Sequence, residues 1–420
     1  MSQSIRIYKL LANHKLFNKK IHFGLERIKL ALSRLGHPEK KLSNVIQVIG
    51  SDGKYTLLTS LKFFIEANNQ TVATHISPSL QDIKERFWIG DRYLTHSEIR
   101  KTIKVIEKLK IPLTIFEVLT LVFIINVAKE NNNFVILEAG CGWRLDSNNI
   151  IDFPLIQSVV NINKQHLRLL KAKNLNDVIY EKVGFLSQFS NIYVGRQKTK
   201  VLKRIKHLLK NNSSQINYSK SWKLVKKKNG YFYKDKKTII KLNTKYIYSR
   251  GLLNNLCLAI KISLDLKIDK KIIVEALPEI RYTGRIDYLD KGKLTKKLYK
   301  NEKILLDGCH SEISGANLYN YLKTLKVPIY GIWAMTKNKN PDSFLKQFKG
   351  IFKKIVTVDI ENESASLSKN KLSKIAKKNC NNVEIAENFD KALQKITSKE
   401  RKIICIFGSL YLCGNVLNKN

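Results

Sequence analysis

The sequence predicts an α/β fold of two domains, in which the larger N-terminal domain has a mostly parallel sheet with helices on both faces. Three observations support this prediction. The chain has 420 residues, which is long for one ordinary domain. Short apolar runs of strand length alternate with longer segments of helical periodicity. Apolar strands that alternate with helices are typical of βαβ units, whose parallel strands are buried on both faces.

In the N-terminal part, the expected strands and helices follow one another along the chain. An amphipathic helical region is expected over Ile5–Leu35, and the turn Gly36-His37-Pro38 ends it. Strands are expected at Val45–Ile49, Thr71–Ile76, Arg86–Ile89, Phe134–Glu138 and Leu155–Ile162. Helices are expected from Leu57 to about Asn68 and over Ser97–Leu109, Phe116–Glu130 and Leu175–Val183.

The pattern changes between Asn191 and Tyr248, where short hairpin-like pieces with Lys-rich turns are expected. A helix over Gly251–Leu266 follows. We place the domain boundary near residues 286–303, so that the expected domains are residues 1–290 and 291–420. Beyond the boundary, strands of a smaller sheet are expected at Ile304–Leu306, Ile329–Trp333, Ile355–Val358 and Ile403–Phe407. Their alternation with helical segments predicts a Rossmann-like α/β domain.

The formal net charge of +42 has two interpretations. It is typical of proteins that bind nucleic acid or an anionic membrane. It is also what an A+T-rich genome produces, because Lys is spread along the chain and Asn, Ile and Tyr are abundant. We favour the second interpretation, so nucleic acid is not expected as a partner. The densest clusters, Lys203–Lys210 and Lys223–Lys228, are expected in surface loops or hairpins.

Other features of the composition indicate a cytoplasmic protein. No run of about 18 apolar residues is present, so no transmembrane helix is expected. The N-terminus lacks the apolar core and small-residue cleavage site of a signal peptide, so export is not expected. None of the six cysteines forms a C-x-x-C pair. We expect them to be buried free thiols in a reducing compartment.

The stretch Gly50–Thr56 has the composition of a phosphate-binding loop, which makes the N-terminal domain P-loop-type. It follows an apolar strand and precedes a helix. Gly50 and Gly53 permit a tight turn and a close approach of the backbone to a ligand. Lys54 can reach phosphate oxygens, and the Thr56 hydroxyl can bind Mg²⁺. The spacing differs from the standard form, so an ordinary strand–turn–helix corner is the alternative.

Polar residues follow several of the expected strands. The loop Gly50–Thr56, Ser77, Glu138 and His166 each fall at the carboxyl end of a strand. In a parallel sheet these ends meet at one edge, where ligands bind. Four points far apart in the sequence therefore predict one site. Each residue alone has an ordinary alternative: Glu138 as a surface carboxylate, and His166 as a loop histidine without a metal.

Several motifs resemble those of folylpolyglutamate synthases of the bifunctional dihydrofolate synthase type, within the Mur ligase superfamily. They occur in the same order along nearly the whole chain. The motifs are Gly50–Thr56, Ser77-Pro78, Thr114–Glu117, Glu138–Asn148, Glu181–Gly184, Gly284-Arg285, Asp307–His310 and Gly408–Leu412. Each motif alone is weak, but the shared order makes chance similarity improbable.

The resemblance implies an ATP-dependent ligase that adds L-glutamate to dihydropteroate, to a folate, or to both, through an acyl phosphate. It implies ATP and two Mg²⁺ ions as cofactors, and we expect a monomer. The residues that it implies for ATP are Gly50, Gly53, Lys54, Tyr55, Thr56, Asn255, Arg285 and Asp307. The metal ligands that it implies are Thr56, Ser77, Glu138, His166 and Lys182, the last of which the family carbamylates. A carbamate gives a hard metal the oxygen ligands that it prefers.

The resemblance also implies the residues of the substrate site and of catalysis. The pterin or folate site is expected at Thr114, Ile115, Phe116, Glu117, Leu145, Asp146 and Ser147. The expected catalytic residues are Lys54, Lys182, Arg285 and His310, with His310 near the acyl phosphate. Closure of the C-terminal domain is expected to exclude water from the activated acid.

The chain departs from the family pattern at several positions. Near the phosphate loop, Asp52 replaces Asn, Tyr55 replaces Gly, and Gln165 replaces the Asp before the metal-binding histidine. In the C-terminal domain, Ser311-Glu312 replaces Asn-Pro, and Thr336-Lys337-Asn338 replaces Asp-Lys-Asp. These changes leave an alternative open, in which the chain is a catalytically weakened ATP-binding relative with a regulatory or binding role. A nucleic-acid-associated protein is a further alternative, favoured by charge alone.

Overall fold

The computed structural model describes residues 3–420, which form two compact units. Unit 1 holds the chain up to Asn243 together with Asn254–Pro278, and unit 2 holds Thr244–Leu253 together with Glu279–Asn420. Helix α8 (Arg250–Asp265) therefore begins in unit 2 and ends in unit 1. Within residues 3–420, no helix combines the length and the apolar character needed to cross a bilayer.

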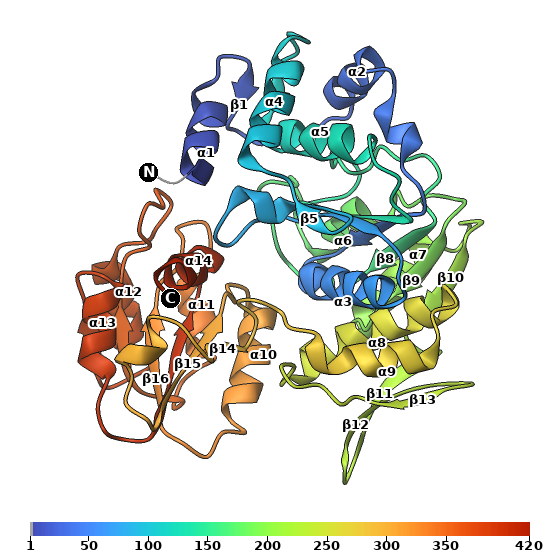
Figure 1. The fold of residues 1–420 in the computed structure, drawn as a ribbon. Helices are drawn as coiled ribbons and strands as arrows, with labels where there is room; N and C mark the ends of the chain where they lie inside the picture. The colour runs from blue at the N-terminus through green and yellow to red at the C-terminus, as the bar shows by residue number, and fades with distance from the viewer. Residues whose placement is uncertain (1–2) are drawn as a thin grey trace. The chain divides into compact units, whose positions relative to one another are not determined.

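Unit 1 is built around an eight-stranded sheet (Figure 1). In order across the sheet, its strands are β10 (Gln215–Tyr218), β9 (Asn191–Val194), β8 (Ile156–Val159), β2 (Val45–Ile49), β7 (Phe134–Glu138), β3 (Val72–His75), β4 (Phe87–Ile89) and β5 (Arg92–Tyr93). The first six run parallel, and β4 and β5 are antiparallel at the edge. The expected mostly parallel sheet is confirmed.

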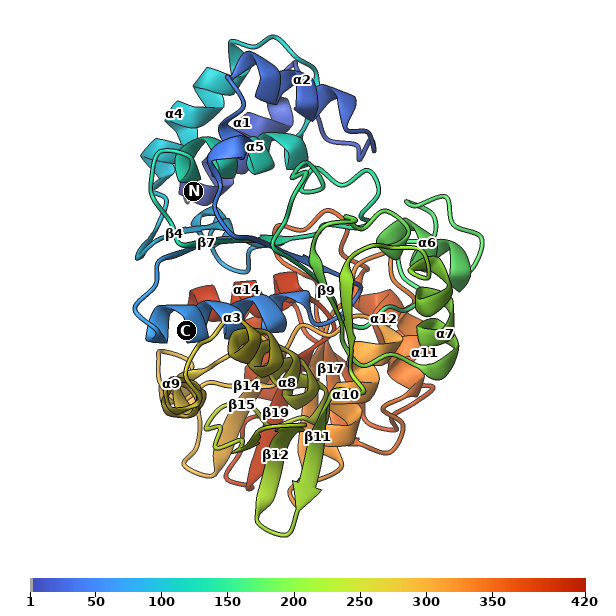
Figure 2. The ribbon, with the colours of Figure 1, turned by 90° about the vertical axis from the view of Figure 1, so that its right-hand side faces the viewer.

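Helices cover both faces of this sheet (Figure 2). One face carries α4 (His96–Glu107) and α5 (Ile115–Val127), with α1 (Gln3–Asn13) and α2 (Glu26–Arg34) packed beside them. On the other face, α3 (Lys54–Ala67) packs against β2, β3 and β7, and α9 (Lys270–Ala276) packs against α3. The helices α6 (Leu175–Val183) and α7 (Thr199–Leu208) share a second apolar core with β8 and β9. Short 3₁₀ helices lie at Pro38–Lys41 and Ile83–Arg86.

The expected helical region over Ile5–Leu35 is wrong in its middle. Between α1 and α2 the chain forms a two-residue strand, β1 (Phe17–Asn18), which pairs in parallel with β6 (Leu113–Thr114). Phe17 is buried in the core, but the polar residues that follow it and Gly24 give no continuous apolar face. A helix through this stretch would have had nothing to pack with.

The expectation that Lys203–Lys210 lies in loops or hairpins is also wrong, because most of this cluster belongs to α7. Val201 and Ile205 are buried and stand four residues apart, so they share one face of the helix. The exposed Lys203 and Lys206 lie on the solvent side, and the high content of basic residues obscured this period. The other cluster does lie in a hairpin-like sheet, as expected, formed by β11 (Trp222–Lys227), β12 (Gly230–Asp235) and β13 (Ile239–Lys241).

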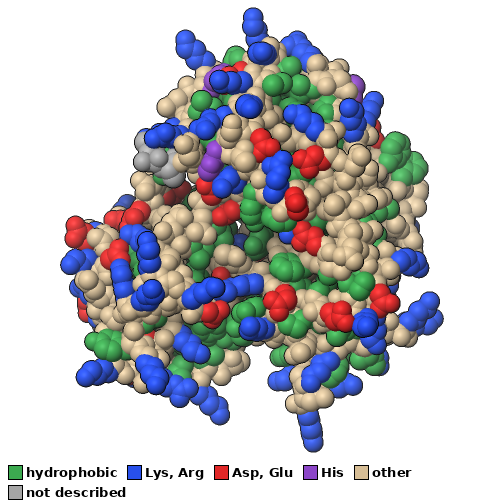
Figure 3. Space-filling model, in the orientation of Figure 1, with side chains coloured by type: hydrophobic (Ala, Val, Ile, Leu, Met, Phe, Trp, Pro, Cys, Tyr) green, Lys and Arg blue, Asp and Glu red, His purple; other side chains and the backbone are tan. Residues whose placement is uncertain are grey.

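Basic side chains are spread over the visible surface, as Figure 3 shows, and do not gather in one patch there. All six cysteines are free thiols; Cys141 is half-buried and the other five are buried. The expectation of buried free thiols is therefore confirmed for five of the six.

Unit 2 contains a six-stranded sheet. In order, its strands are β14 (Asp287–Tyr288), β15 (Glu302–Asp307), β19 (Lys402–Phe407), β16 (Ile329–Trp333), β17 (Phe352–Thr357) and β18 (Val383–Ile385). All pairs are parallel except that of β14 with β15. The helices are α10 (Glu312–Leu322), α11 (Pro341–Lys346), α12 (Lys369–Ala376), α13 (Phe389–Ile396) and α14 (Leu410–Lys419), with a 3₁₀ helix at Thr295–Lys297. Another 3₁₀ helix, Leu277–Glu279, lies where the chain passes from unit 1 to unit 2. The four expected strands are present, and two short edge strands, β14 and β18, were not expected.

Candidate active site

The loop between β2 and α3 is shaped by two glycines in the left-handed region. Gly50 has φ 143° and Gly53 has φ 100°. A Cβ at Gly50 would collide with Val160, and one at Gly53 would collide with the side-chain amide of Asn255. Glycine is therefore required at both positions on conformational and on steric grounds. The loop places its backbone at the N-terminus of α3, where the helix dipole favours an anion.

Lys54 folds back over this loop. Its Nζ lies 3.2 Å from the carbonyl oxygen of Ser51 and 3.4 Å from that of Gly50, both of which accept hydrogen bonds. The same Nζ is 3.9 Å from Oε1 of Glu138, at the carboxyl end of β7. The ammonium group is therefore held between the loop and a buried carboxylate, within reach of any phosphate that the loop binds.

Thr56, in the first turn of α3, is hydrogen-bonded to Asn255 of α8. The Thr56 hydroxyl donates to the carbonyl oxygen of Gly53 at 2.9 Å and accepts a hydrogen bond of 2.9 Å from Nδ2 of Asn255. A second lone pair of this oxygen is left for a metal ion or a water. Tyr55 stands half-buried between Lys54 and Thr56.

Glu138 is fixed by the loop that follows β3. Its Oε2 accepts a hydrogen bond of 3.0 Å from the backbone N–H of Ser77, which precedes Pro78 in a cis peptide. The backbone oxygen of Glu138 accepts from Nδ2 of Asn148 at 2.8 Å. The side chain of Glu138 is almost fully buried. Three strand ends therefore meet at this carboxylate, as the sequence predicts for Ser77, Glu138 and the phosphate loop.

Lys182, in the last turn of α6, reaches the same loop from the opposite side. It is only 1% exposed, and its Nζ donates to the carbonyl oxygens of Gly50 at 2.9 Å and Cys141 at 2.8 Å. Burial, followed by the positive charge of Lys54, lowers its pKa to about 7. Near neutral pH a large fraction of this amine is therefore uncharged and nucleophilic.

His166 lies in the loop Asn161–His166, which follows β8 and is hydrogen-bonded to the phosphate loop. Its backbone adopts φ 58°, and its carbonyl oxygen accepts from the N–H of Leu170 at 2.9 Å. Among the residues that the structure describes, no group of three or more His, Cys, Asp and Glu side chains is arranged to hold a metal. The oxygen ligands that this region offers are the Glu138 carboxylate, which is bonded to the Ser77 N–H, and the hydroxyls of Ser77 and of Thr56 in the first turn of α3.

These donors fit Mg²⁺, which prefers oxygen ligands and usually takes one or two carboxylates together with substrate phosphates. Glu138 provides such a carboxylate, because it is buried and faces Lys54 beside an anion-binding loop.

The segment Thr114–Glu117 forms the start of α5. Thr114 is the N-cap: its Oγ1 accepts from the N–H of Glu117 at 3.2 Å, and the Glu117 carboxylate accepts from the N–H of Thr114 at 2.6 Å. Glu117 also pairs with Arg27 at 3.0 Å. The side chains of Thr114 and Glu117 are both buried and form a capping box. The half-buried Ile115 packs against the core. Their part in substrate binding stays a prediction.

Phe116 and Asp146 both lie against Gly140. A Cβ at Gly140 would be 3.1 Å from the ring of Phe116 and from Oδ2 of Asp146, and would crowd both. Asp146 accepts backbone hydrogen bonds from Gly140 at 2.8 Å and Asn148 at 3.0 Å. Burial outweighs these bonds and raises its pKa to about 6. The neighbouring Ser147 hydroxyl is bonded to that of Thr120 at 2.8 Å, and Leu145 is half-buried.

In unit 2, the residues expected to bind nucleotide gather at the carboxyl end of β15. Asp307 accepts from the N–H groups of Ile286 at 2.9 Å and Cys309 at 2.7 Å. Burial raises its pKa, while the nearby Arg285 opposes that shift. Arg285 donates to the carbonyl oxygen of Gly284 at 3.0 Å, and Nδ1 of His310 lies 2.9 Å from that of Gly308. Arg285, Asp307 and His310 thus belong to one cluster within unit 2.

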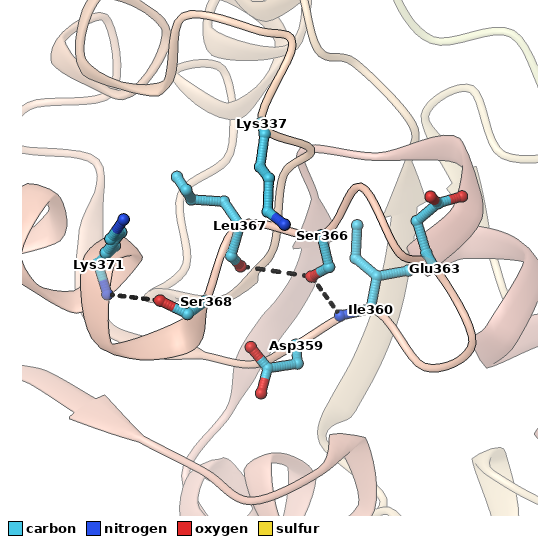
Figure 4. A pocket seen from close by; sticks show the side chains of 8 residues that line it. All are labelled: Lys337, Asp359, Ile360, Glu363, Ser366, Leu367, Ser368 and Lys371. Carbon is cyan, nitrogen blue, oxygen red and sulfur yellow. Dashed lines mark hydrogen bonds between the residues drawn. The ribbon is translucent and has the colours of Figure 1, made fainter. Parts of the chain in front are cut away.

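A cavity of about 700 Å³ lies beyond the carboxyl ends of β16 and β17 in unit 2 (Figure 4). Side chains of both charges line it, together with hydroxyls at the start of α12. They are Lys337, Asp359, Ile360, Glu363, Ser366, Leu367, Ser368 and Lys371. Lys337 belongs to one of the segments in which the chain departs from the family pattern.

Two residues of this site had no role predicted from the sequence, although Asn148 ends the motif Glu138–Asn148. Asn148 is fully buried and joins three strands, because it bonds to the backbone of Glu138, to Gln47 through its own carbonyl oxygen at 3.0 Å, and to His75 at 3.4 Å. Asn163 holds the loop after β8 to Asp52. A polar residue directly after an apolar run was the available signal for Asn163, but it does not identify a partner.

Comparison with known proteins connects this chain to one group. Residues 290–419 match the family described as dihydrofolate synthetase, C-terminal domain. The chain is 23% identical over 415 residues to the dihydrofolate synthase/folylpolyglutamate synthase of Bacillus subtilis (strain 168), covering 94% of each chain. It is 25% identical over 419 residues to that of Buchnera aphidicola subsp. Schizaphis graminum, covering 96% of this chain and 94% of the relative.

Solved structures agree in fold. FolC from Escherichia coli, in complex with DHPP and ADP, matches with a TM-score of 0.86 at 21% identity, over 99% of this chain and 97% of that one. Folylpolyglutamate synthase from Thermotoga maritima matches with a TM-score of 0.81 at 24% identity, over 99% and 96% of the two chains. By sequence along its length and by fold, the chain is similar to the dihydrofolate synthase/folylpolyglutamate synthases.

Proposed function

We propose that this chain is an ATP-dependent ligase that joins L-glutamate to dihydropteroate, to a folate, or to both, through an acyl phosphate. The observation that carries the proposal is the meeting of Lys54, Glu138 and Lys182 around the phosphate loop. Curated relatives that align along the whole chain are named dihydrofolate synthase/folylpolyglutamate synthase. A solved structure of similar fold contains Mn, AMPPNP and L-glutamate.

In the first step, an oxygen of the substrate carboxylate attacks the γ-phosphorus of ATP, and the bond to the β-phosphate oxygen breaks to release ADP. The loop N–H groups, the N-terminus of α3 and Lys54 would stabilise the charge that spreads over the transferring phosphoryl group. Lys54 is already restrained by two carbonyl oxygens and by Glu138, so little reorganisation is needed when phosphate binds.

Magnesium ions would be held by the Glu138 carboxylate and the hydroxyls of Thr56 and Ser77. We extend this ligand set to His166 and to a carbamate on Lys182, because the amine of Lys182 is buried and its pKa is lowered to about 7. Bound Mg²⁺ supplies charge neutralisation at the phosphate oxygens. Glu138 itself keeps the metal position fixed, because one of its oxygens is bonded to the Ser77 N–H.

In the second step, the amine of glutamate attacks the carbonyl carbon of the acyl phosphate, loses a proton, and phosphate leaves. We propose that the cavity of unit 2 binds the donor amino acid. Lys337 and Lys371 supply positive charge for its carboxylates, and Asp359 and Glu363 supply negative charge for its ammonium group. Arg285, Asp307 and His310 are proposed to contact the nucleotide and the acyl phosphate.

The test is phosphate release by the purified chain with ATP and Mg²⁺, with dihydropteroate or tetrahydrofolate as the acid. We expect release only when both the acid and L-glutamate are present, with a glutamylated product in the mass spectrum. Lys54→Met should reduce the rate by about 10²–10³-fold, as for other single groups that stabilise transition-state charge. Release that needs neither acid nor glutamate would contradict the proposal and favour the weakened relative. Salt-sensitive RNA binding without turnover would favour the nucleic-acid alternative.

We also propose that the chain acts in the cytoplasm as a monomer. Five buried free thiols are in accord with a reducing compartment. Size-exclusion chromatography with light scattering would test the oligomeric state.

A further inference from the structure

Two loops of unit 1 are joined side by side by a dense set of hydrogen bonds. One is the phosphate loop, and the other is the loop Asn161–His166 after β8. The N–H groups of Ser51 and Asp52 both donate to the carbonyl oxygen of Asn161, at 2.8 and 3.3 Å. The Ser51 hydroxyl lies 3.1 Å from the N–H of Asn163, which donates to it, and 3.4 Å from that residue's carbonyl oxygen.

The carboxylate of Asp52 forms the side-chain part of this connection. Its Oδ2 accepts a hydrogen bond of 2.6 Å from Nδ2 of Asn163 and one of 2.9 Å from Nε2 of Gln165. Asn163 is only 8% exposed, so its amide has little access to water. One carboxylate oxygen therefore binds two side chains that lie 111 and 113 residues further along the chain.

We propose that Asp52 is a positioning residue, which fixes the loop Asn161–His166 against the phosphate loop and thereby sets the place of His166. This inference rests on the proposed function, because it assigns a role to Asp52 in the same nucleotide and metal site. Gln165 is adjacent to His166 in sequence, so restraining its side chain restrains the backbone that carries the histidine. That backbone has φ 58°, a conformation that a non-glycine residue keeps only when its surroundings hold it.

Charge explains why a carboxylate is tolerated in a loop that binds phosphate. Lys54 and the buried Lys182 of α6 both donate hydrogen bonds to the carbonyl oxygen of Gly50 in this loop. Two ammonium groups so close together repel each other, and an anion between the elements that carry them offsets the repulsion. The negative charge of Asp52 does act on Lys182, where it favours the charged amine. Because Oδ2 is occupied by two amide donors, the carboxylate is directed at the second loop.

The hydrogen bond between Asp52 and Gln165 also unites two of the departures noted in the sequence. At position 52 an acid stands in place of an amide, and at position 165 an amide stands in place of an acid. Either arrangement contains one carboxylate and one amide, a combination that is able to form this hydrogen bond with the charge on one side or the other. Two changes that look like losses in isolation therefore compensate each other.

The test is a double-mutant cycle of isosteric exchanges. Gln165→Glu alone places two carboxylates within hydrogen-bond distance, and Asp52→Asn alone leaves two neutral amides. The double variant, Asp52→Asn with Gln165→Glu, restores one acid and one amide. We expect Gln165→Glu to raise the Mg²⁺ concentration for half-maximal ligation, and the Kd for Mg·ADP, about tenfold. The double variant should return to within about threefold of the unchanged protein. Asp91→Asn, at an exposed turn, is the control for net charge.

Additivity, in which the change in free energy of Mg·ADP binding in the double variant equals the sum of the changes in the two single variants, would overturn the inference. The inference would also be overturned if all three variants had the same loss in thermal stability and the same rise in Mg²⁺ requirement. That result would indicate a merely structural contact. If Gln165→Glu does not fold, recovery of the unfolding temperature and of Mg·ADP binding in the double variant still tests the pair. Absence of ligation by the unchanged protein, with an intact cycle in Mg·ADP binding, would contradict the proposed function alone.

Discussion

Lys182 and Gly50 are joined by a hydrogen bond of 2.9 Å, although 132 positions separate them in the sequence. The bond ties the end of α6 to the first residue of the phosphate loop. It also removes the amine from solvent, which is why burial is the largest cause of its lowered pKa. A lysine on a helix is ordinarily solvated and charged. Lys182 is instead a buried amine, and about half of it is neutral near pH 7.

The first prediction concerns carbamylation of Lys182. A carbamate forms by attack of the neutral amine on CO₂, so the fraction available rises as pH increases through about 7, the pKa of this group. With carbon-13-labelled bicarbonate, we expect a carbamate signal in the NMR spectrum that grows between pH 6 and pH 8. Lys182→Gln should lose it. A signal of the same size in Lys182→Gln would assign the carbamate to another lysine and contradict the prediction.

The second prediction concerns Glu138. The exchange Glu138→Gln keeps an oxygen for the Ser77 N–H but removes the charge that faces Lys54 at 3.9 Å. We expect phosphate release to fall by about 10²–10³-fold and the Mg²⁺ requirement to rise, because a carboxylate ligand is lost. The measurement is the rate of release against MgCl₂ concentration. Glu117→Gln removes a second buried carboxylate of unit 1 and is the control. A similar Mg²⁺ shift in both variants would contradict a specific role for Glu138.

The site could be predicted from the sequence where chemistry coincides with strand ends. The loop Gly50–Thr56 and Glu138 directly follow apolar runs, and in a parallel sheet such positions must meet. Lys182 had no such signal, since a lysine on a helix is ordinarily solvated; only the order of the motifs identified it. The role of Asn148, which ends one of the motifs, could not be predicted from the sequence, because a buried amide has the same local pattern as one in a loop.

The fold could be predicted because apolar strands alternate with helical segments. The prediction failed where the composition obscures the periodicity of apolar residues. The lysines of α7 hid the pair Val201 and Ile205, which alone shows the helical face. At the N-terminus, Phe17 is buried in a two-residue strand whose partner, Leu113–Thr114, lies almost a hundred residues away. No local window of sequence contains that pairing.

The third prediction separates folding from substrate binding at Thr114. Its hydroxyl caps α5 in a reciprocal capping box with Glu117. Thr114→Ala should lower the free energy of unfolding by about 1 kcal/mol, as for other N-cap residues, measured by urea denaturation. Thr114→Ser keeps the capping oxygen and is the control. If the Thr114 hydroxyl also binds the pteroate or folate substrate, as the resemblance implies, the KM for that substrate should rise in Thr114→Ala and change less than threefold in Thr114→Ser. A tenfold rise in KM in Thr114→Ala alone would show that the residue also binds substrate.

The fourth prediction uses the raised pKa of Asp146, about 6. Above pH 6 the folded protein holds an ionised carboxylate there, and below pH 6 a neutral acid. If Asp146 accepts hydrogen bonds from a pterin, as the resemblance implies, the KM for dihydropteroate should rise as pH falls through about 6. Asp146→Asn should have a higher KM that no longer changes in this range. An unchanged pH profile in Asp146→Asn would assign the transition to another group.

The last prediction tests the cavity of unit 2 as the place of the amino acid. Lys337 lines it, and within residues 3–420 its side-chain Nζ donates one hydrogen bond, of 3.2 Å, to the carbonyl oxygen of Ser364. A substrate carboxylate would be a stronger partner, since charge-assisted hydrogen bonds are roughly twice as strong as neutral ones. Lys337→Met should therefore raise the KM for L-glutamate about tenfold, with the KM for ATP unchanged.

Lys346 provides the matched control, because it is exposed in the same unit on α11 and does not line the cavity. Lys346→Met removes the same charge and should leave the KM for glutamate unchanged. Equal effects of the two variants would reflect only the positive potential of unit 2. A fall in kcat without a change in KM for Lys337→Met would contradict a role in glutamate binding, because a loss of uniform binding raises KM alone. It would show that the lysine acts only when the transition state forms.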